Sequence, residues 1–189
     1  VKLFLDNQKD DGQFPCFVLD SSNPGTKAYG RLIGYGQIQE CVSFTALCLE
    51  AAILLDDKQL LSEAYDKCIK WDQWLVNNRS TTNRGLIELF CQFDTGHDNS
   101  SRLADIPGGC PSGDAKNMND VDCLPLLAPD MNAVFYGSRV ALAKMANLLG
   151  KPQEAAQWQE KANSVKQRLI EICYDENDEF FYDVDRYGE

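Results

Sequence analysis

The sequence predicts an all-α fold built from repeated pairs of helices. Two segments, 38–55 and 131–149, are apolar on nearly every side, which is typical of helices buried within a protein. Each is followed by a segment with one apolar stripe and one charged face, 58–78 and then 152–173. Repeated inner and outer helices of this kind stack into a solenoid or close into an α/α barrel.

Length and composition limit the class of protein. The 189 residues are 44% hydrophobic and 25% charged, which is ordinary for a single soluble domain spanning 1–189. No apolar run is long enough to cross a membrane. The net charge of −11 disfavours nucleic acids and anionic membranes as partners and suits neutral or cationic ligands, sugars included.

The helix boundaries carry recognisable signals. Residues 1–9 have the pattern of the last turns of a helix, without the anatomy of a signal peptide. Asp56 and Asp57 are expected to cap the helix at 58–78, and Asp130 the helix at 131–149. Gly150 and Pro152 then separate the last two helices. The tail, 174–189, is predicted to form a turn and short extended pieces.

The long connections are predicted to gather at one end of the helices. Helices joined by tight turns pack antiparallel, so the two inner helices should run parallel, with their N-termini at the same end. The loops 10–37 and 79–130 lead into those N-termini. Because long loops inside a compact domain are uncommon and usually functional, this end is the expected place for a polar pocket.

The most polar part of the second loop is Phe93-Asp94-Thr95-Gly96-His97-Asp98-Asn99-Ser100-Ser101-Arg102. It holds two carboxylates, the only histidine of the chain, an amide, hydroxyls and a guanidinium around a glycine that permits a sharp turn. Two interpretations stand side by side. The segment is either a solvated loop with an Asp–Arg pair or a binding and catalytic cluster held between rigid helices.

The cysteines do not form a metal motif. Eight are scattered without a CxxC pair, and a single histidine adds few ligands, so neither a metal nor another cofactor is predicted. Cys110 and Cys123 lie in loop and could pair. The remaining pattern favours a reducing compartment such as the cytoplasm. Buried thiols are expected where cysteines fall in apolar helical patterns: Cys41, Cys48, Cys68 and Cys173.

Segments along nearly the whole chain resemble, in order, motifs of the family 63 glycoside hydrolases and the trehalase-like enzymes of family 37. The segment 94–102 resembles their Glu-Ser-Gly-x-Asp-Asn-Ser-x-Arg motif, with Asp94-Thr95 in place of Glu-Ser. Gln39-Glu40-Cys41 stands where the family has Gln-Pro-Pro. Further matches are Asp11–Pro15, Trp71–Leu75, Asp130–Ala133, Leu148–Gly150 and Tyr174–Asp183.

The resemblance implies part of a six-hairpin (α/α)6 barrel that hydrolyses glycosidic bonds with inversion. The expected substrates are oligosaccharides or disaccharides cleaved from the end at α-glucosidic bonds. Asp98 would be the general acid, and Asn99 and Arg102 would bind the sugar beside it. The other residues expected to line the substrate site are Asp94, His97, Gln39, Asp130 and Asn132.

Inverting hydrolysis needs a protonated carboxyl and a second carboxylate that activates water on the opposite face of the sugar. Asp94 is expected to supply negative charge near Asp98, and Arg102 to point at sugar hydroxyls or at Asp94. The family's general base, a glutamate late in the barrel, has no counterpart here. The chain therefore resembles a middle segment of a longer catalytic domain, expected to be inactive alone and prone to self-association through uncovered apolar flanks.

Two other functions fit the same pattern. One is a carbohydrate-binding α/α protein that has the pocket but no catalysis, and the other is a helical scaffold whose loops bind protein. A thermal-shift panel of glycosides would separate a sugar binder from a scaffold. Aromatic residues at the loop-bearing end favour a sugar site: Phe14, Phe17, Tyr29, Tyr35, Phe90, Phe93 and Phe135.

Overall fold

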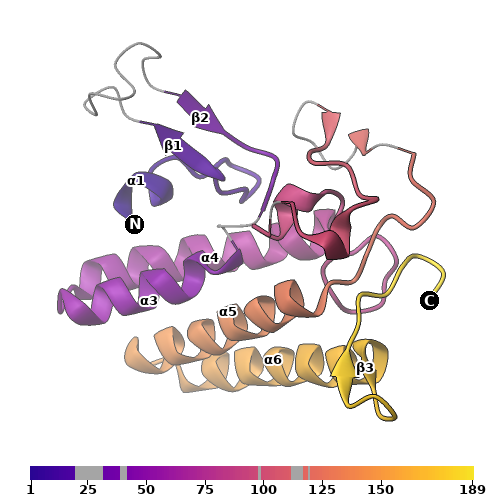
Figure 1. Ribbon diagram of the computed structural model, residues 1–189. Coiled ribbons are helices and arrows are strands. Elements are labelled where there is room, and N and C mark those ends of the chain that lie inside the picture. The colour runs from indigo at the N-terminus through magenta and orange to yellow at the C-terminus, as the bar shows by residue number, and fades with distance from the viewer. Residues whose placement is uncertain (20–31, 39–41, 98, 112–116, 119) are drawn as a thin grey trace.

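The architecture is that of two long helical hairpins with loops gathered at one end (Figure 1). The computed structural model describes residues 1–19, 32–38, 42–97, 99–111, 117–118 and 120–189. The helices are α1 (Lys2–Leu5), α3 (Phe44–Leu54), α4 (Lys58–Asn78), α5 (Pro129–Leu148) and α6 (Pro152–Cys173). The predicted all-α class is confirmed.

The outer helices begin and end where the sequence places them. Asp57 caps α4, since its side chain accepts a hydrogen bond from the backbone N–H of Leu60 at 2.9 Å. The inner helix α5 differs in its start, because Ala128 is the capping residue and Pro129 takes the first helical position. Proline suits that position, where no backbone N–H is needed, so Asp130 lies in the first turn instead of capping the helix.

The inner helix α3 is shorter than predicted. It begins at Phe44 instead of residue 38, while residues 39–41 lie outside the described part of the chain. Its outward face is not buried: Leu54 is 81% exposed and Leu55 just beyond it 68% exposed. The apolar character of α3 on all sides therefore leaves an open apolar flank on the chain.

The inner helices run parallel, as predicted. Figure 1 shows α3 and α5 starting at the end where the loops gather and running the same way. The helix α3 packs against both α4 and α5, and α5 packs against α6. The Ser138 hydroxyl in the middle of α5 donates a hydrogen bond to the carbonyl of Val42, which ties α5 to the start of α3. At the far end Ala52 and Leu148 line one groove.

The core is rich in aromatic rings between α1, α3 and α4. Trp71 and Trp74 stack with ring centroids 5.1 Å apart, and Phe14 packs against Trp71 at 5.8 Å and Phe44 at 4.8 Å. Phe14 is 1% exposed. The ring of Phe14 is therefore part of the packing that fixes the first segment on α4 and is not a surface for sugar stacking.

Within the described residues, two short pairs of strands lie outside the helices. The pair in the first loop was not predicted from the sequence. In that loop β1 (Phe17–Leu19) pairs antiparallel with β2 (Leu32–Gly34), with Val18 opposite Ile33. In the tail β3 (Tyr174–Asp175) pairs with β4 (Phe180–Phe181), in agreement with the expected extended pieces. Two 3₁₀ turns, η1 (Gln92–Asp94) and η2 (Ser101–Leu103), lie in the second loop.

The thiols within the described residues are mostly buried. Cys110 and Cys123 do not form the disulfide that their loop positions allowed. A hydrogen bond with Cys110 and burial raise the pKa of Cys91, and a hydrogen bond with Cys68 and burial raise that of Cys48. These cysteines are therefore protonated thiols with low reactivity. No helix in the described part of the chain has the length and apolarity needed to cross a bilayer.

Candidate active site

A buried ion pair anchors the polar loop to the helices. Asp94, at the end of η1, is 1% exposed, and its Oδ2 lies 2.6 Å from Nη1 of Arg79 at the C-terminal end of α4. The same oxygen accepts the backbone N–H of Phe90 at 3.0 Å, and Oδ1 accepts that of Ile38 at 3.2 Å. Arg79 also donates from Nη2 to the carbonyl of Gly36. Segments far apart in sequence are thus joined at one point.

The residues on either side of position 98 are held by short-range hydrogen bonds. The hydroxyl of Thr95 donates to the carbonyl of Gln92 at 2.9 Å and accepts the backbone N–H of His97 at 2.9 Å. The backbone N–H of Asn99 donates to Oε1 of Gln92 at 3.3 Å. Gly96 and Asn99 both adopt positive φ, 73° and 61°, which glycine and asparagine tolerate best. Asp98 itself lies outside the described residues.

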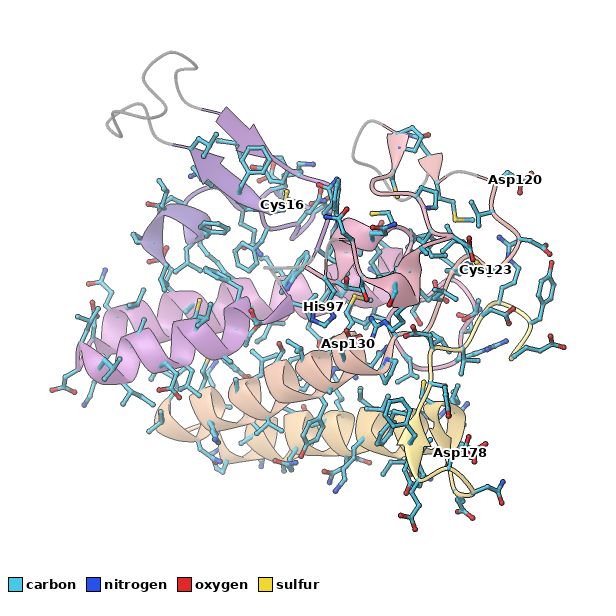
Figure 2. The ribbon with its side chains drawn as sticks, viewed as in Figure 1. Cys16, His97, Asp120, Cys123, Asp130 and Asp178 are labelled. Carbon is cyan, nitrogen blue, oxygen red and sulfur yellow. The ribbon has the colours of Figure 1, made fainter. Side chains whose placement is uncertain are left out.

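Two side chains from this loop converge on Asp130 at the start of α5. Nδ1 of His97 lies 3.2 Å from Oδ2 of Asp130, and Nη2 of Arg102 donates to the same oxygen at 2.9 Å. Figure 2 shows His97 and Asp130 facing each other between the loop and the helix start. The residues on both sides of position 98 are therefore bound to one carboxylate at the N-terminus of an inner helix.

A second carboxylate, Asp183 from the tail after β4, completes the cluster. Its Oδ2 lies 3.1 Å from Nε of Arg102, and its side chain is 15% exposed. Burial raises the pKa of Asp183 above its ordinary value, with Asp130 adding to the effect and Arg102 opposing it. Arg102 was expected to face sugar hydroxyls or Asp94. Its guanidinium instead lies between Asp130 and Asp183, and Asp94 forms its ion pair with Arg79.

Two candidate substrate residues are buried by contacts within the protein. Asn132 is 0% exposed; its amide donates to the carbonyls of Ile87 at 2.9 Å and Ala128 at 3.0 Å, and it accepts the N–H of Ile87 at 2.8 Å. These contacts account for its polar atoms and hold the loop against α5, while a contact of Asn132 with a sugar stays a prediction. The same applies to Asp94. Gln39 lies outside the described residues.

The sequence prediction missed Arg79 and Asp183 as members of this end of the molecule. The only sequence signal for Asp183 was its place at the close of the 174–183 segment. Nothing local marks Arg79, because it follows a charged helix face and its partners come from distant loops.

Among the aromatic candidates, Phe93 is 39% exposed beside Asp94, whereas Phe90 is 4% exposed and lies under Arg79. Phe135, at 2% exposed, belongs to the core.

Comparison with known proteins gives this end of the molecule its context. The model of the mannosylglycerate hydrolase MGH1-like glycoside hydrolase domain matches residues 1–189. The chain belongs to this family. Over 110 residues, 58% of the chain, it is 29% identical to a trehalase from Bombyx mori, of which the match covers 18%.

The solved structures agree on the fold. A GH63 mannosylglycerate hydrolase from Thermus thermophilus in complex with glucose superposes over 100% of the chain with a TM-score of 0.72 at 18% identity. The same enzyme in complex with Tris and D-glycerate gives 0.73 at 16% identity. The chain has the fold of part of an (α/α)6 barrel. It covers 54% and 56% of those two structures, about half of their length.

Proposed function

We propose that this chain carries the acid side of a glycosidase site that hydrolyses glycosidic bonds with inversion, with Asp98 as the general acid. The substrates would be neutral oligosaccharides or disaccharides, for which no cofactor is needed. The observation that supports this most directly is the convergence of His97 and Arg102, on either side of position 98, on Asp130 at the start of α5. This supports a position for Asp98 at the loop-bearing end.

The chemistry requires one proton donor on the leaving-group side. Asp98 would give its proton to the glycosidic oxygen as the bond from that oxygen to the anomeric carbon breaks. A water molecule would attack the anomeric carbon from the opposite face and lose its proton to a second carboxylate, roughly 6.5–9.5 Å from the acid. Asp98 must therefore hold its proton near neutral pH, which nearby carboxylates favour. Asp94 and Asp130 belong to the same end of the molecule.

Asp94 is a poor candidate for the second carboxylate. Its side chain is 0% exposed, and it accepts hydrogen bonds from Arg79 and from the backbone N–H groups of Ile38 and Phe90. A base has to reach the attacking water, which a carboxylate enclosed by donors does not do. This supports a general base supplied by a part of the barrel beyond these 189 residues.

The test of the general acid is Asp98→Asn in the complete protein. The amide has nearly the same shape but no acidic proton, so hydrolysis of natural glycosides should fall about 10²–10⁴-fold. Glycosides with a good leaving group, such as an aryl glycoside, should lose much less, because departure of that group needs little protonation. Asp178→Asn, an exposed carboxylate in the turn between β3 and β4, is the matched control and should retain activity. Equal losses on both substrate classes would contradict the assignment.

The chain by itself should not hydrolyse these substrates. We infer this from the enclosed state of Asp94 and from coverage of about half of the related barrels. Measurement of turnover on a panel of glucosides, together with light scattering for molecular mass, checks the point. Robust turnover by a monodisperse monomer would show that a general base lies within the chain.

A further inference from the structure

The contacts of Asp183 set it apart from the rest of the tail. Its Oδ2 lies 3.1 Å from Nε of Arg102, an ion pair that brings the tail against the polar loop. Its other oxygen, Oδ1, is buried and has no hydrogen-bond partner within the described residues. A buried carboxylate oxygen without a partner is costly, so its presence calls for an explanation.

The tail is held by hydrogen bonds that do not involve Asp183. Val184 forms two backbone hydrogen bonds with Leu127, 2.8 and 3.1 Å long, and Tyr182 donates its N–H to Cys173 at 2.8 Å. Arg84 holds the carbonyls of residues 185 and 186. These bonds would remain if residue 183 were neutral. Burial moreover raises the pKa of Asp183, so the site disfavours the charge that the residue brings.

The effect of Asp183 is on Arg102. Asp183 forms an ion pair at Nε and Asp130 forms one at Nη2, so carboxylates from the tail and from α5 hold two sides of one planar guanidinium. Arg102 is otherwise a long side chain with many rotamers and is 35% exposed. Within the part of the chain that the structure describes, its Nη1 has no protein partner. Two fixed sides of a rigid fork determine where the third side points.

We infer that Asp183 is a positioning residue for Arg102, which it holds together with Asp130 so that Nη1 faces the sugar. This inference rests on the proposed function, in which Arg102 binds a sugar hydroxyl beside Asp98. Asp183 need not touch the substrate. It links the tail to the site through Arg102. Loss of its carboxylate would free the Nε side of the guanidinium and leave only Asp130 to hold it.

The kinetic test compares Asp183→Ala with Asp183→Glu and Asp178→Ala in the complete protein. Loss of the Asp183 carboxylate should raise KM for a neutral glucoside about tenfold with little change in kcat, as expected when a contact made equally in the ground and transition states is lost. Asp183→Glu keeps an acceptor and should restore much of the binding. Asp178→Ala removes the same charge from the neighbouring β3–β4 hairpin, away from Arg102, and should behave as wild type.

A double variant tests whether Asp183 acts through Arg102. If it does, Asp183→Ala should add no further loss to Arg102→Ala. Losses that multiply, or a kcat and KM for Asp183→Ala equal to those of wild type, would overturn the inference. Misfolding is excluded by an unchanged urea midpoint for Asp183→Ala, which the independent bonds of the tail lead us to expect.

A spectroscopic readout separates this inference from the proposed function. The Nε–H signal of Arg102, assigned by its disappearance in Arg102→Lys, should report a guanidinium of restricted motion in 15N relaxation of wild type and of Asp178→Ala, because Asp130 and Asp183 both pair with it. The guanidinium should be more mobile in Asp183→Ala. If wild type neither binds nor cleaves glycosides, the proposed function fails, and the role of Asp183 in sugar binding fails with it. Restricted motion of Arg102 would then show that the two carboxylates hold the guanidinium without that role, and a mobile guanidinium in wild type would overturn the positioning itself.

Discussion

The two ends of the helical hairpins use polar residues in different ways. At the loop end, where α3 and α5 begin, Arg79, Asp94 and Asn132 are buried and bind segments distant in sequence. At the turn end, three-residue connections, 55–57 and 149–151, join each inner helix to its outer partner. Distant segments also meet towards the turn end, where the Tyr65 hydroxyl donates to Oε2 of Glu154 and accepts from Nε1 of Trp158. The buried Arg79–Asp94 pair and the carboxylates around Arg102 lie at the loop end.

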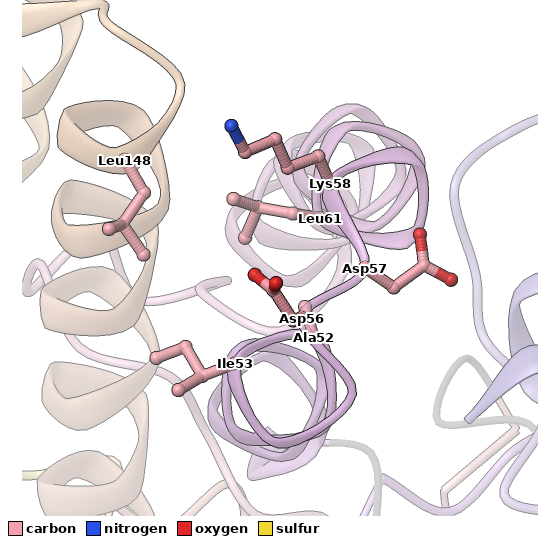
Figure 3. A pocket seen from close by; sticks show the side chains of 7 residues that line it. All are labelled: Ala52, Ile53, Asp56, Asp57, Lys58, Leu61 and Leu148. Atoms are coloured by element: carbon pink, nitrogen blue, oxygen red, sulfur yellow. The ribbon is translucent and has the colours of Figure 1, made fainter.

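The turn end has a groove but no comparable cluster within the described residues. The groove has a volume of about 220 Å³ and lies between the ends of α3 and α5 and the start of α4 (Figure 3). Most of its walls are aliphatic, and its acidic residues sit in the turn before α4. Asp57 caps α4, so its charge has a local structural use. The residues that line the groove are Ala52, Ile53, Asp56, Asp57, Lys58, Leu61 and Leu148.

The largest effect on stability is expected at the loop end, from Arg79→Met. The substitution keeps much of the apolar volume but leaves the Asp94 carboxylate buried without its cation, which typically costs about 3–5 kcal/mol. Urea unfolding followed by circular dichroism measures the loss. Lys2→Met, which removes an exposed partner of Glu63, is the control and should barely move the midpoint. A similar small shift for both variants would mean that the Arg79–Asp94 pair does not hold the loop.

Asn132→Leu should have the next largest effect. Leucine is close in size, but it leaves the N–H and the carbonyl of Ile87 without the partners they have in the wild type. An unsatisfied buried backbone group costs about 1–3 kcal/mol, and Asn132→Leu would leave both the N–H and the carbonyl of Ile87 unsatisfied. Amide exchange at Ile87 should also accelerate. Asn77→Leu, on the exposed side of α4, provides the comparison, and equal behaviour of the two variants would contradict the structural role of Asn132.

Prediction from sequence succeeded where the determinants are local. The bounds of α4 and α6 follow from one-sided periodicity, an aspartate cap and the Gly150–Pro152 separation, all within a few residues of the helix. The short turns make each inner helix antiparallel to its outer partner, but the parallel course of the inner helices also depends on the long connection from α4 to α5, which starts and ends at the same end of the molecule. The start of α5 was misplaced because Pro129 and Asp130 both signal a helix start and only the proline occupies the first position.

The site could be predicted only as far as its own segment. The motif around residues 94–102 located the loop, but the partner of each charge depends on long-range placement. Arg79 is paired with Asp94 and Arg102 with Asp130 and Asp183, whereas the sequence led us to expect Arg102 at sugar hydroxyls or at Asp94. An arginine at a helix end and an aspartate in a tail carry no local mark of such contacts, so only the fold identifies them.

At the turn end, Asp57→Ala should cost about 1 kcal/mol, the usual value for loss of an N-terminal cap. The N–H of Leu60 loses its acceptor, but water can replace it because this end of α4 is exposed. Asp57→Asn keeps an acceptor oxygen and should be nearly neutral. The measurement is the free energy of unfolding in urea. A loss for Asp57→Ala as large as that for Arg79→Met would remove the contrast between the two ends.

The smallest effect on stability is expected from Leu54→Glu, on the open flank of α3. Leu54 is 81% exposed, so the substitution removes few contacts and should change the free energy of unfolding by less than about 0.5 kcal/mol. Its effect on association should be larger, since it puts a charge into an apolar surface that also includes Leu47 and Leu55. Light scattering over a concentration series should show a lower mean mass for the variant than for the wild-type chain.

Ile170→Glu on α6, 45% exposed in the wild type, is the matched control because it makes the same change on an outer helix. If both variants lower the mass equally, association is not specific to the flank of α3. If neither does, the exposed apolar face of this inner helix does not drive self-association.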